Sequence, residues 1–105
     1  MNGDMMPPVE LKGGLSRYWW MLSPPMGRLR VSRDRLEIFS TLGDIVPPLR
    51  AERDNVLRVE FQRRLSCSRV VVVMADGTAA RTRFLTFSRP HTEAVLEQFG
   101  WPVAA

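Results

Sequence analysis

The sequence predicts a mainly β domain (α+β): a small antiparallel sheet pair or partly closed barrel, capped by one C-terminal helix. Three observations lead to this fold class. Residues 70–74 are apolar at every position, as in a covered strand, and an Asp-Gly pair, a strong hairpin signal, follows them. Residues 55–65 alternate between apolar and polar side chains, as a strand with one buried face does. Pro90 and Gly100 suit the first position and the C-terminal end of a short helix.

The size and composition indicate one domain. The 105 residues are close to the commonest domain size, and 45% of them are hydrophobic, which is enough for a single core. No apolar run approaches the roughly 20 residues of a membrane-spanning helix. Residues 1–4 lack the features of a secretory signal, and Cys67, the single cysteine, has no partner for an internal disulfide. We therefore expect a cytoplasmic protein.

Two residue pairs suggest that the N-terminal part is irregular. Pro7-Pro8 and Gly13-Gly14 do not suit a regular element, so we expect residues 1–14 to form a flexible leader. The folded domain would then span residues 15–103.

Residues 15–22 have two interpretations. Their aromatic content favours a strand, whereas Ser16 as an N-cap would allow two turns of helix. In a strand, side-chain alternation would place Trp19 and Trp20 on opposite faces, so one indole would lie in the core and the other near the surface. An exposed indole beside a sheet edge would favour self-association or capture of a partner peptide by strand addition.

The other segments predict further strands. Residues 27–40 form a hairpin pattern that turns at Arg33-Asp34. Residues 42–53 predict a loop with a short edge segment, because Pro47-Pro48 excludes a central strand. Apolar residues of opposite parity in residues 79–87 predict a strand with either a bulge or strong coiling near Phe84.

The C-terminal segment predicts a helix over residues 90–99 with an apolar stripe. Gly100 suits a left-handed conformation, and Trp101 is placed to pack back on Leu96. The helix and strands together predict one apolar core. The residues expected in it are Leu29, Val31, Leu36, Ile38, Leu57, Val59, Phe61, Val72, Phe84, Leu96 and Phe99.

Motifs that carry catalysis are absent from the sequence. It has no glycine-rich phosphate loop, no paired-cysteine metal spacing and no nucleophile elbow. His91 is the only histidine, so it alone could serve as the base for a Cys67 nucleophile. We interpret His91 as a surface residue of the first helical turn and Cys67 as a loop or buried thiol. We therefore expect no enzyme, no catalytic residues, no metal site and no cofactor.

Four arginines surround the predicted hairpin. Arg28, Arg30 and Arg35 could offer their guanidinium groups to a phosphate. The alternative is an ordinary solvated surface, on which Asp34 and Glu37 neutralise these arginines.

Residues 18–21 form an aromatic and methionine run next to Arg17. Such residues are enriched in the centres of protein interfaces and also suit a peripheral membrane contact. Packing in the core is the alternative. The candidate contact residues are therefore Trp19, Trp20, Arg28, Arg30 and Arg35.

The net charge of +4 arises from 15 basic residues, all arginine except Lys12, against 11 acidic ones. Because the acids are interleaved with the arginines, we expect no continuous basic stripe and no strong nucleic-acid binding. Binding of nucleic acid by a basic β-barrel would require Arg58, Arg81 and Arg83 on the same face as an exposed aromatic residue.

The order of predicted elements resembles a bacterial pleckstrin-homology-like (PH-like) domain. The similar parts are the hairpin at residues 29–40, the strand at 55–62, the strand and Asp-Gly turn at 70–77, the strand with Phe84 and Phe87, and the helix at 90–99. This resemblance implies a sheet pair capped by a C-terminal helix.

The same resemblance implies a non-enzymatic binding module. Lipid-binding members share a basic K-x(n)-[KR]-x-R pattern, of which Arg28-Leu29-Arg30 supplies only the R-x-R part. The tryptophan inside the helix of eukaryotic members is also missing, since Trp101 lies beyond the helix. Protein binding or self-association is therefore the function that the resemblance favours. The alternative is a basic β-barrel that binds nucleic acid or an anionic, phosphate-bearing ligand.

Overall fold

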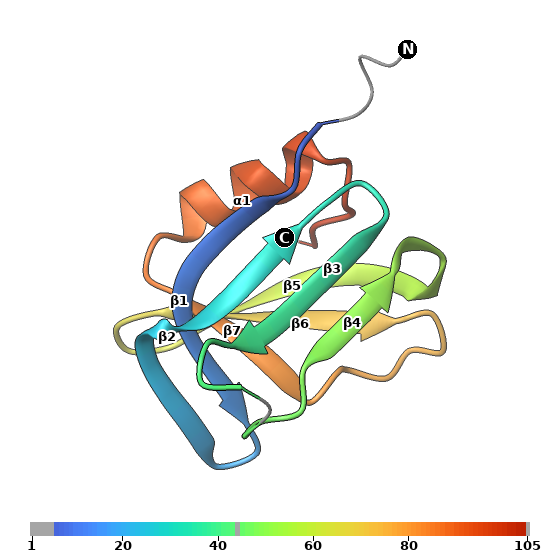
Figure 1. Cartoon of the computed structure of the whole chain (residues 1–105). Helices are drawn as coiled ribbons and strands as arrows, with labels where there is room; N and C mark the ends of the chain where they lie inside the picture. Colours follow the sequence, from blue (N-terminus) through green and yellow to red (C-terminus); the bar gives the residue numbers. More distant parts are fainter. Residues whose placement is uncertain (1–5, 44, 105) are drawn as a thin grey trace.

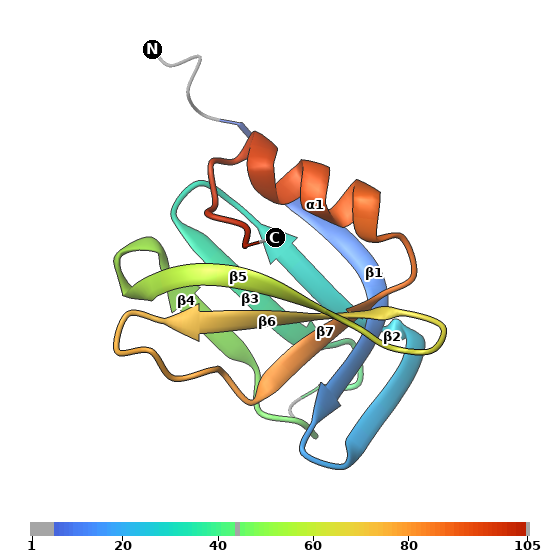
Figure 2. The same ribbon diagram turned by 180° about the vertical axis from the view of Figure 1, so that it is seen from behind.

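The computed structural model describes residues 6–43 and 45–104 as a curled antiparallel sheet with one helix. The sheet has seven strands in the order β4-β3-β2-β1-β7-β6-β5 and forms a half-barrel, while the helix lies across one end of it beside β1 (Figures 1 and 2). The predicted fold class is therefore confirmed. The elements are β1 (Val9–Arg17), β2 (Trp20–Val31), β3 (Arg35–Ser40), β4 (Leu49–Glu52), the 3-10 helix η1 (Arg53–Asn55), β5 (Val56–Arg63), β6 (Ser68–Met74), β7 (Thr82–Thr86) and α1 (Arg89–Gln98).

The inner face of the half-barrel and one side of α1 enclose the core. Most residues predicted in the core are buried, and Phe61 is half-buried against it. Leu57 is the exception: its prediction was wrong, because the side chain is 47% exposed. The β5–β6 register shifts between Val56 and Arg58, so Leu57 does not follow the alternation that buries Val59.

The prediction of a leader over residues 1–14 was wrong for the part that forms β1. This strand starts at Val9 and pairs with β2 on one side and β7 on the other. A Cβ atom on Gly13 would lie 2.3 Å from the carbonyl oxygen of Leu85, so glycine at this position permits a close approach of two strands. The part of the predicted leader in residues 1–5 lies outside the described residues.

Three local predictions concerned strands β2 to β4 and β7. The hairpin over residues 27–40 is confirmed, with Val31 opposite Leu36, and β4 is the expected short edge strand. Of the bulge or strong coiling predicted near Phe84, the bulge was wrong, because β7 pairs with β1 and β6 without a register shift. Leu85 is instead buried on the outer face, where Gly14 has no side chain to displace it, and Phe87 is exposed beyond the end of the strand.

The predicted helix is confirmed, although it begins and ends one residue earlier than expected. Hydrogen bonds and packing hold its C-terminal end in place. Gly100 adopts a φ of 79°, and the backbone N–H of Trp101 donates to the carbonyl of Leu96 over 3.0 Å. The Trp101 indole is buried and donates to the carbonyl of Ser32 over 2.8 Å. The guanidinium of Arg53 lies 4.7 Å from the ring centroid and donates to the carbonyl of Gly100 over 2.6 Å. The end of α1 is thus joined to the β2–β3 turn and to η1.

Candidate functional site

The turn between β1 and β2 exposes two adjacent tryptophans. Arg17 pairs with Trp20, so Tyr18 and Trp19 form the connection between the strands. The side chain of Trp19 is 86% exposed and that of Trp20 is 56% exposed. The expectation that one indole lies in the core was wrong, because the chain reverses between the two tryptophans instead of continuing as one strand.

The backbone of this turn adopts an uncommon conformation for its sequence. Tyr18 has a φ of 56°, in the left-handed region that side-chain-bearing residues rarely occupy. The Tyr18 ring lies 5.5 Å from the guanidinium carbon of Arg17 and 5.3 Å from that of Arg81. Cation–π contacts, rather than burial, therefore hold this exposed ring. Strained residues of this kind cluster at functional sites, at a cost of about 1–3 kcal/mol each.

The β2 arm of the hairpin extends beyond β3, whereas the end of β1 pairs with β7 up to Arg17. β3 pairs with β2 only from Gly27 to Val31, and Thr41 adds one backbone hydrogen bond to Met26. Trp20, Met21 and Leu22 pair with β1 on one side, and within the described residues no backbone hydrogen bond reaches the other side of residues 20–23. Pro24 and Pro25, which lack N–H groups, end this open edge.

The two outermost strands of the sheet are less accessible to a partner. β4 has only four residues, and Arg35 on β3 forms an ion pair with its Glu52. The edge of β5 is covered at Val59, which donates to the carbonyl of Pro102 and accepts from the N–H of Ala104. Short, charged or covered edges resist strand addition. The open edge of β2 is therefore the best-placed edge for pairing with another chain.

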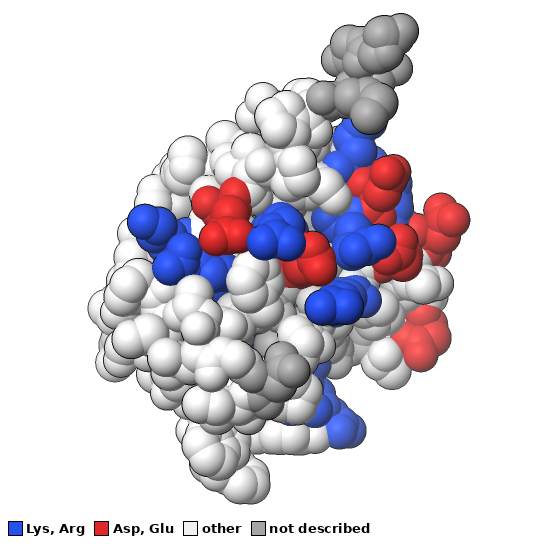
Figure 3. Space-filling view, viewed as in Figure 1, with Lys and Arg blue, Asp and Glu red and all other residues white. Residues whose placement is uncertain are grey.

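More exposed apolar side chains occur near the hairpin. Tyr18, Met21, Met26, Leu42 and Ile45 are each at least 36% exposed. Figure 3 shows that the surface over the β1–β2 end and the β3–β4 loop is largely uncharged below a band of mixed charges. We name the side chains of Tyr18, Trp19, Trp20 and Met21, with the open edge of residues 20–23, the aromatic end.

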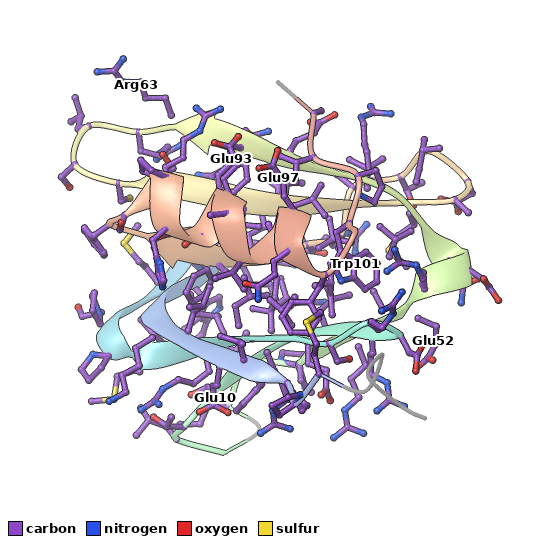
Figure 4. All side chains as sticks on the ribbon, turned by 90° about the horizontal axis from the view of Figure 1, so that it is seen from above. Glu10, Glu52, Arg63, Glu93, Glu97 and Trp101 are labelled. Atoms are coloured by element: carbon purple, nitrogen blue, oxygen red, sulfur yellow. The ribbon has the colours of Figure 1, made fainter. Side chains whose placement is uncertain are left out.

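The three predicted contact arginines lie away from the aromatic end and are paired with carboxylates. Arg28 and Arg30 contact Glu10 over 3.3 and 3.0 Å, and Arg35 contacts Glu52 over 2.7 Å. Figure 4 shows Glu10 on the side of the β1–β2 hairpin that faces away from α1. This geometry favours the neutralised surface over a phosphate site at these arginines. The predicted partner Glu37 contacts Arg30 over 3.5 Å, whereas Glu10 was not predicted.

The two residues considered for nucleophilic chemistry lie on different elements and differ in exposure. Cys67 is half-buried in the β5–β6 loop, and His91 is exposed in the first turn of α1. Among residues 6–43 and 45–104, no group of three or more His, Cys, Asp or Glu residues is arranged to hold a metal ion. No helix in the described part of the chain is both long and apolar enough to cross a membrane.

The fold and this surface define the class of molecule: a small β half-barrel, closed by one helix, with an exposed aromatic hairpin end. No protein-family model and no curated protein sequence matches the chain.

Proposed function

We propose that the protein is a non-enzymatic binding module that associates with a protein partner through the aromatic end, and that a second copy of this chain is that partner. The sheet order and the closing helix are consistent with a bacterial PH-like domain, and domains of this kind are binding modules. The single cysteine, Cys67, supports a cytoplasmic location for this module.

One observation carries the proposal: two adjacent indoles are exposed beside an open strand edge. Exposed tryptophans are uncommon on monomers but enriched at the centres of interfaces, where they supply much of the binding energy. The open edge of residues 20–23 can add backbone hydrogen bonds to the contact.

A second copy fits this edge because the arrangement is self-complementary. Two identical edge segments that pair antiparallel about a twofold axis satisfy each other's backbone groups, and the same side chains meet from both copies. The open segment is only a few residues long, so the interface is small. We therefore expect a weak, concentration-dependent dimer and not a permanent one.

The test is analytical ultracentrifugation over a range of concentrations. The wild-type protein should show a mass that rises from monomer toward dimer, and Trp20→Ser should remain monomeric because it removes an indole next to the open edge. Leu65→Ser is the matched control, because Leu65 is a fully exposed apolar residue in the β5–β6 loop, away from the hairpin.

A wild-type protein that stays monomeric at every concentration would contradict self-association. Equal effects of Trp20→Ser and Leu65→Ser would contradict the assignment of the contact to the aromatic end. Circular dichroism on each variant checks that a loss of the dimer is not caused by unfolding.

A further inference from the structure

A set of arginines lacks the carboxylate partners that neutralise the β2–β4 surface. Within the described residues, no salt bridge involves Arg64, Arg69, Arg81 or Arg83. The prediction of no basic stripe assumed that the acids stay interleaved with the arginines in space. Folding instead gathers Glu10, Glu37 and Glu52 around the arginines of β2 to β4.

Strand register brings two of these arginines together on the outer face of β6 and β7. Val70 pairs with Phe84, and both point into the core, so their neighbours Arg69 and Arg83 point outward. Residues in this diagonal relationship are about 7–8 Å apart, within reach of long side chains. Arg69, Arg81 and Arg83 line one surface hollow together with Tyr18, Ser16 and Ala79. We name this the basic hollow.

The basic hollow concentrates positive charge. Partial burial, and then the nearby charges of Arg64 and Arg83, lower the pKa of Arg69 below its usual value. Its Nε atom is buried and finds no acceptor among the described residues. An anion over the hollow would offset the repulsion between the guanidinium groups.

No carboxylate in the described part of the chain forms an ion pair with the arginines of the basic hollow. Glu60, which lies on the outer face of β5, is bonded to Arg58 of the same strand. Asp76, in the β6–β7 turn, accepts hydrogen bonds from the backbone and the hydroxyl of Thr78, which lower its pKa and keep it ionised, but its described contacts are to Thr78 and not to the arginines. Arg81 and Arg83 line the hollow together with the exposed Tyr18, as a nucleic-acid site was expected to require. Arg58, the third arginine of that expectation, is paired with Glu60 instead.

Aromatic side chains stand at the border of the basic hollow. The Tyr18 ring lines it and contacts Arg81, and Trp19 follows with its ring centroid 6.0 Å from that of Tyr18. Proteins that bind single-stranded nucleic acid combine two features: cationic side chains that contact the phosphate backbone, and aromatic rings on which bases stack.

We propose that the basic hollow and the adjoining Trp19 bind single-stranded nucleic acid, with phosphates on Arg69, Arg81 and Arg83 and a base stacked on the exposed Trp19 ring, while Tyr18 positions Arg81. An acidic peptide would satisfy the guanidinium groups but would leave the Trp19 ring without a flat partner. This site shares Tyr18 and Trp19 with the aromatic end, but its arginines lie on β6, on β7 and just before β7, away from the open edge of β2 that the proposed dimer would pair.

The test is fluorescence anisotropy with a labelled oligothymidine and the full chain, at low and at physiological salt. Arg81→Gln removes an exposed charge and Arg83→Gln removes a half-buried one, while the control Arg50→Gln removes one exposed charge on β4. We expect wild-type binding that weakens with salt. The double variant should bind at least about 10-fold more weakly, and its salt slope should be smaller by about 1.4, because each lost contact contributes roughly 0.7.

The control and a competitor separate this site from general charge effects. Arg50→Gln should change the affinity by less than about twofold, and polyglutamate should displace the oligonucleotide poorly. The proposal is overturned if the wild-type protein does not bind, if Arg50→Gln weakens binding as much as Arg81→Gln alone, or if polyglutamate competes as well as unlabelled oligothymidine. Loss of the dimer in Trp20→Ser with intact oligonucleotide binding would show that the two sites are independent.

Discussion

Replacing Trp101 by alanine should lower the free energy of unfolding by about 3–5 kcal/mol, the range for removing a large buried aromatic side chain. The Trp101 side chain is 3% exposed, and its indole N–H is satisfied by the carbonyl of Ser32. Alanine would leave a cavity, remove that hydrogen bond and deprive Arg53 of the ring over which it lies. The end of α1 would lose its attachment to the β2–β3 turn.

Trp19 provides the matched control for this substitution. The same change at Trp19 should alter stability by less than about 0.5 kcal/mol, because its indole is 86% exposed. Urea unfolding of the wild type, Trp101→Ala and Trp19→Ala, followed by circular dichroism, gives the three values. Equal losses in the two variants would contradict the assignment of Trp101 to the core and of Trp19 to the surface.

Removing residues 1–14 should abolish the native fold, although the sequence suggests a dispensable leader. The deletion removes the pairs from Val9–Val31 to Gly13–Gly27, so β2 loses its main partner over that stretch. It also removes Leu11, which is buried in the core. Unpaired buried backbone groups and exposed apolar surface each destabilise a domain of this size.

Two-dimensional NMR of the truncated chain checks this expectation. We expect collapsed amide dispersion and no cooperative unfolding transition. A well-dispersed spectrum with a melting temperature close to that of the full chain would show that β1 is not required.

The C-terminal half of the fold could be predicted because its signals are local. One or two residues are enough to specify the Asp-Gly turn, the helix start at Pro90 and the helix end at Gly100. Gly77 and Gly100 adopt the positive φ values that such signals imply. The alternation of β3 and most of β5 likewise predicts which side chains reach the core.

β1 could not be predicted because its glycines serve a long-range contact. Gly13 and Gly14 resemble a linker in sequence, but they are the positions where β1 passes closely against β7 and β2. Glycine is needed at these positions because of Leu85, which lies far along the chain, and Leu22, which lies across the hairpin. Local propensity cannot distinguish this use of glycine from flexibility.

The aromatic end was only partly predictable for a similar reason. The sequence draws attention to residues 18–21, whose aromatic and methionine side chains are exposed, but the turn within this run contains no Gly, Asn or Asp. Tyr18 adopts a left-handed φ that its residue type does not favour, so the reversal left no signal in the sequence. The carboxylate partner of Arg28 and Arg30 was missed because Glu10 belongs to the same unpredicted strand.

Hydrogen–deuterium exchange at low and high protein concentration tests the proposed association most directly, because it reports both whether the chain associates and where. We predict that raising the concentration slows amide exchange over residues 20–23 of β2, whose outer edge then pairs with a second copy. Exchange in the β5–β6 loop around Leu65 should not change. Exchange over residues 20–23 that is independent of concentration, or protection that develops only at β4 or the β5–β6 loop, would contradict the aromatic end as the contact surface.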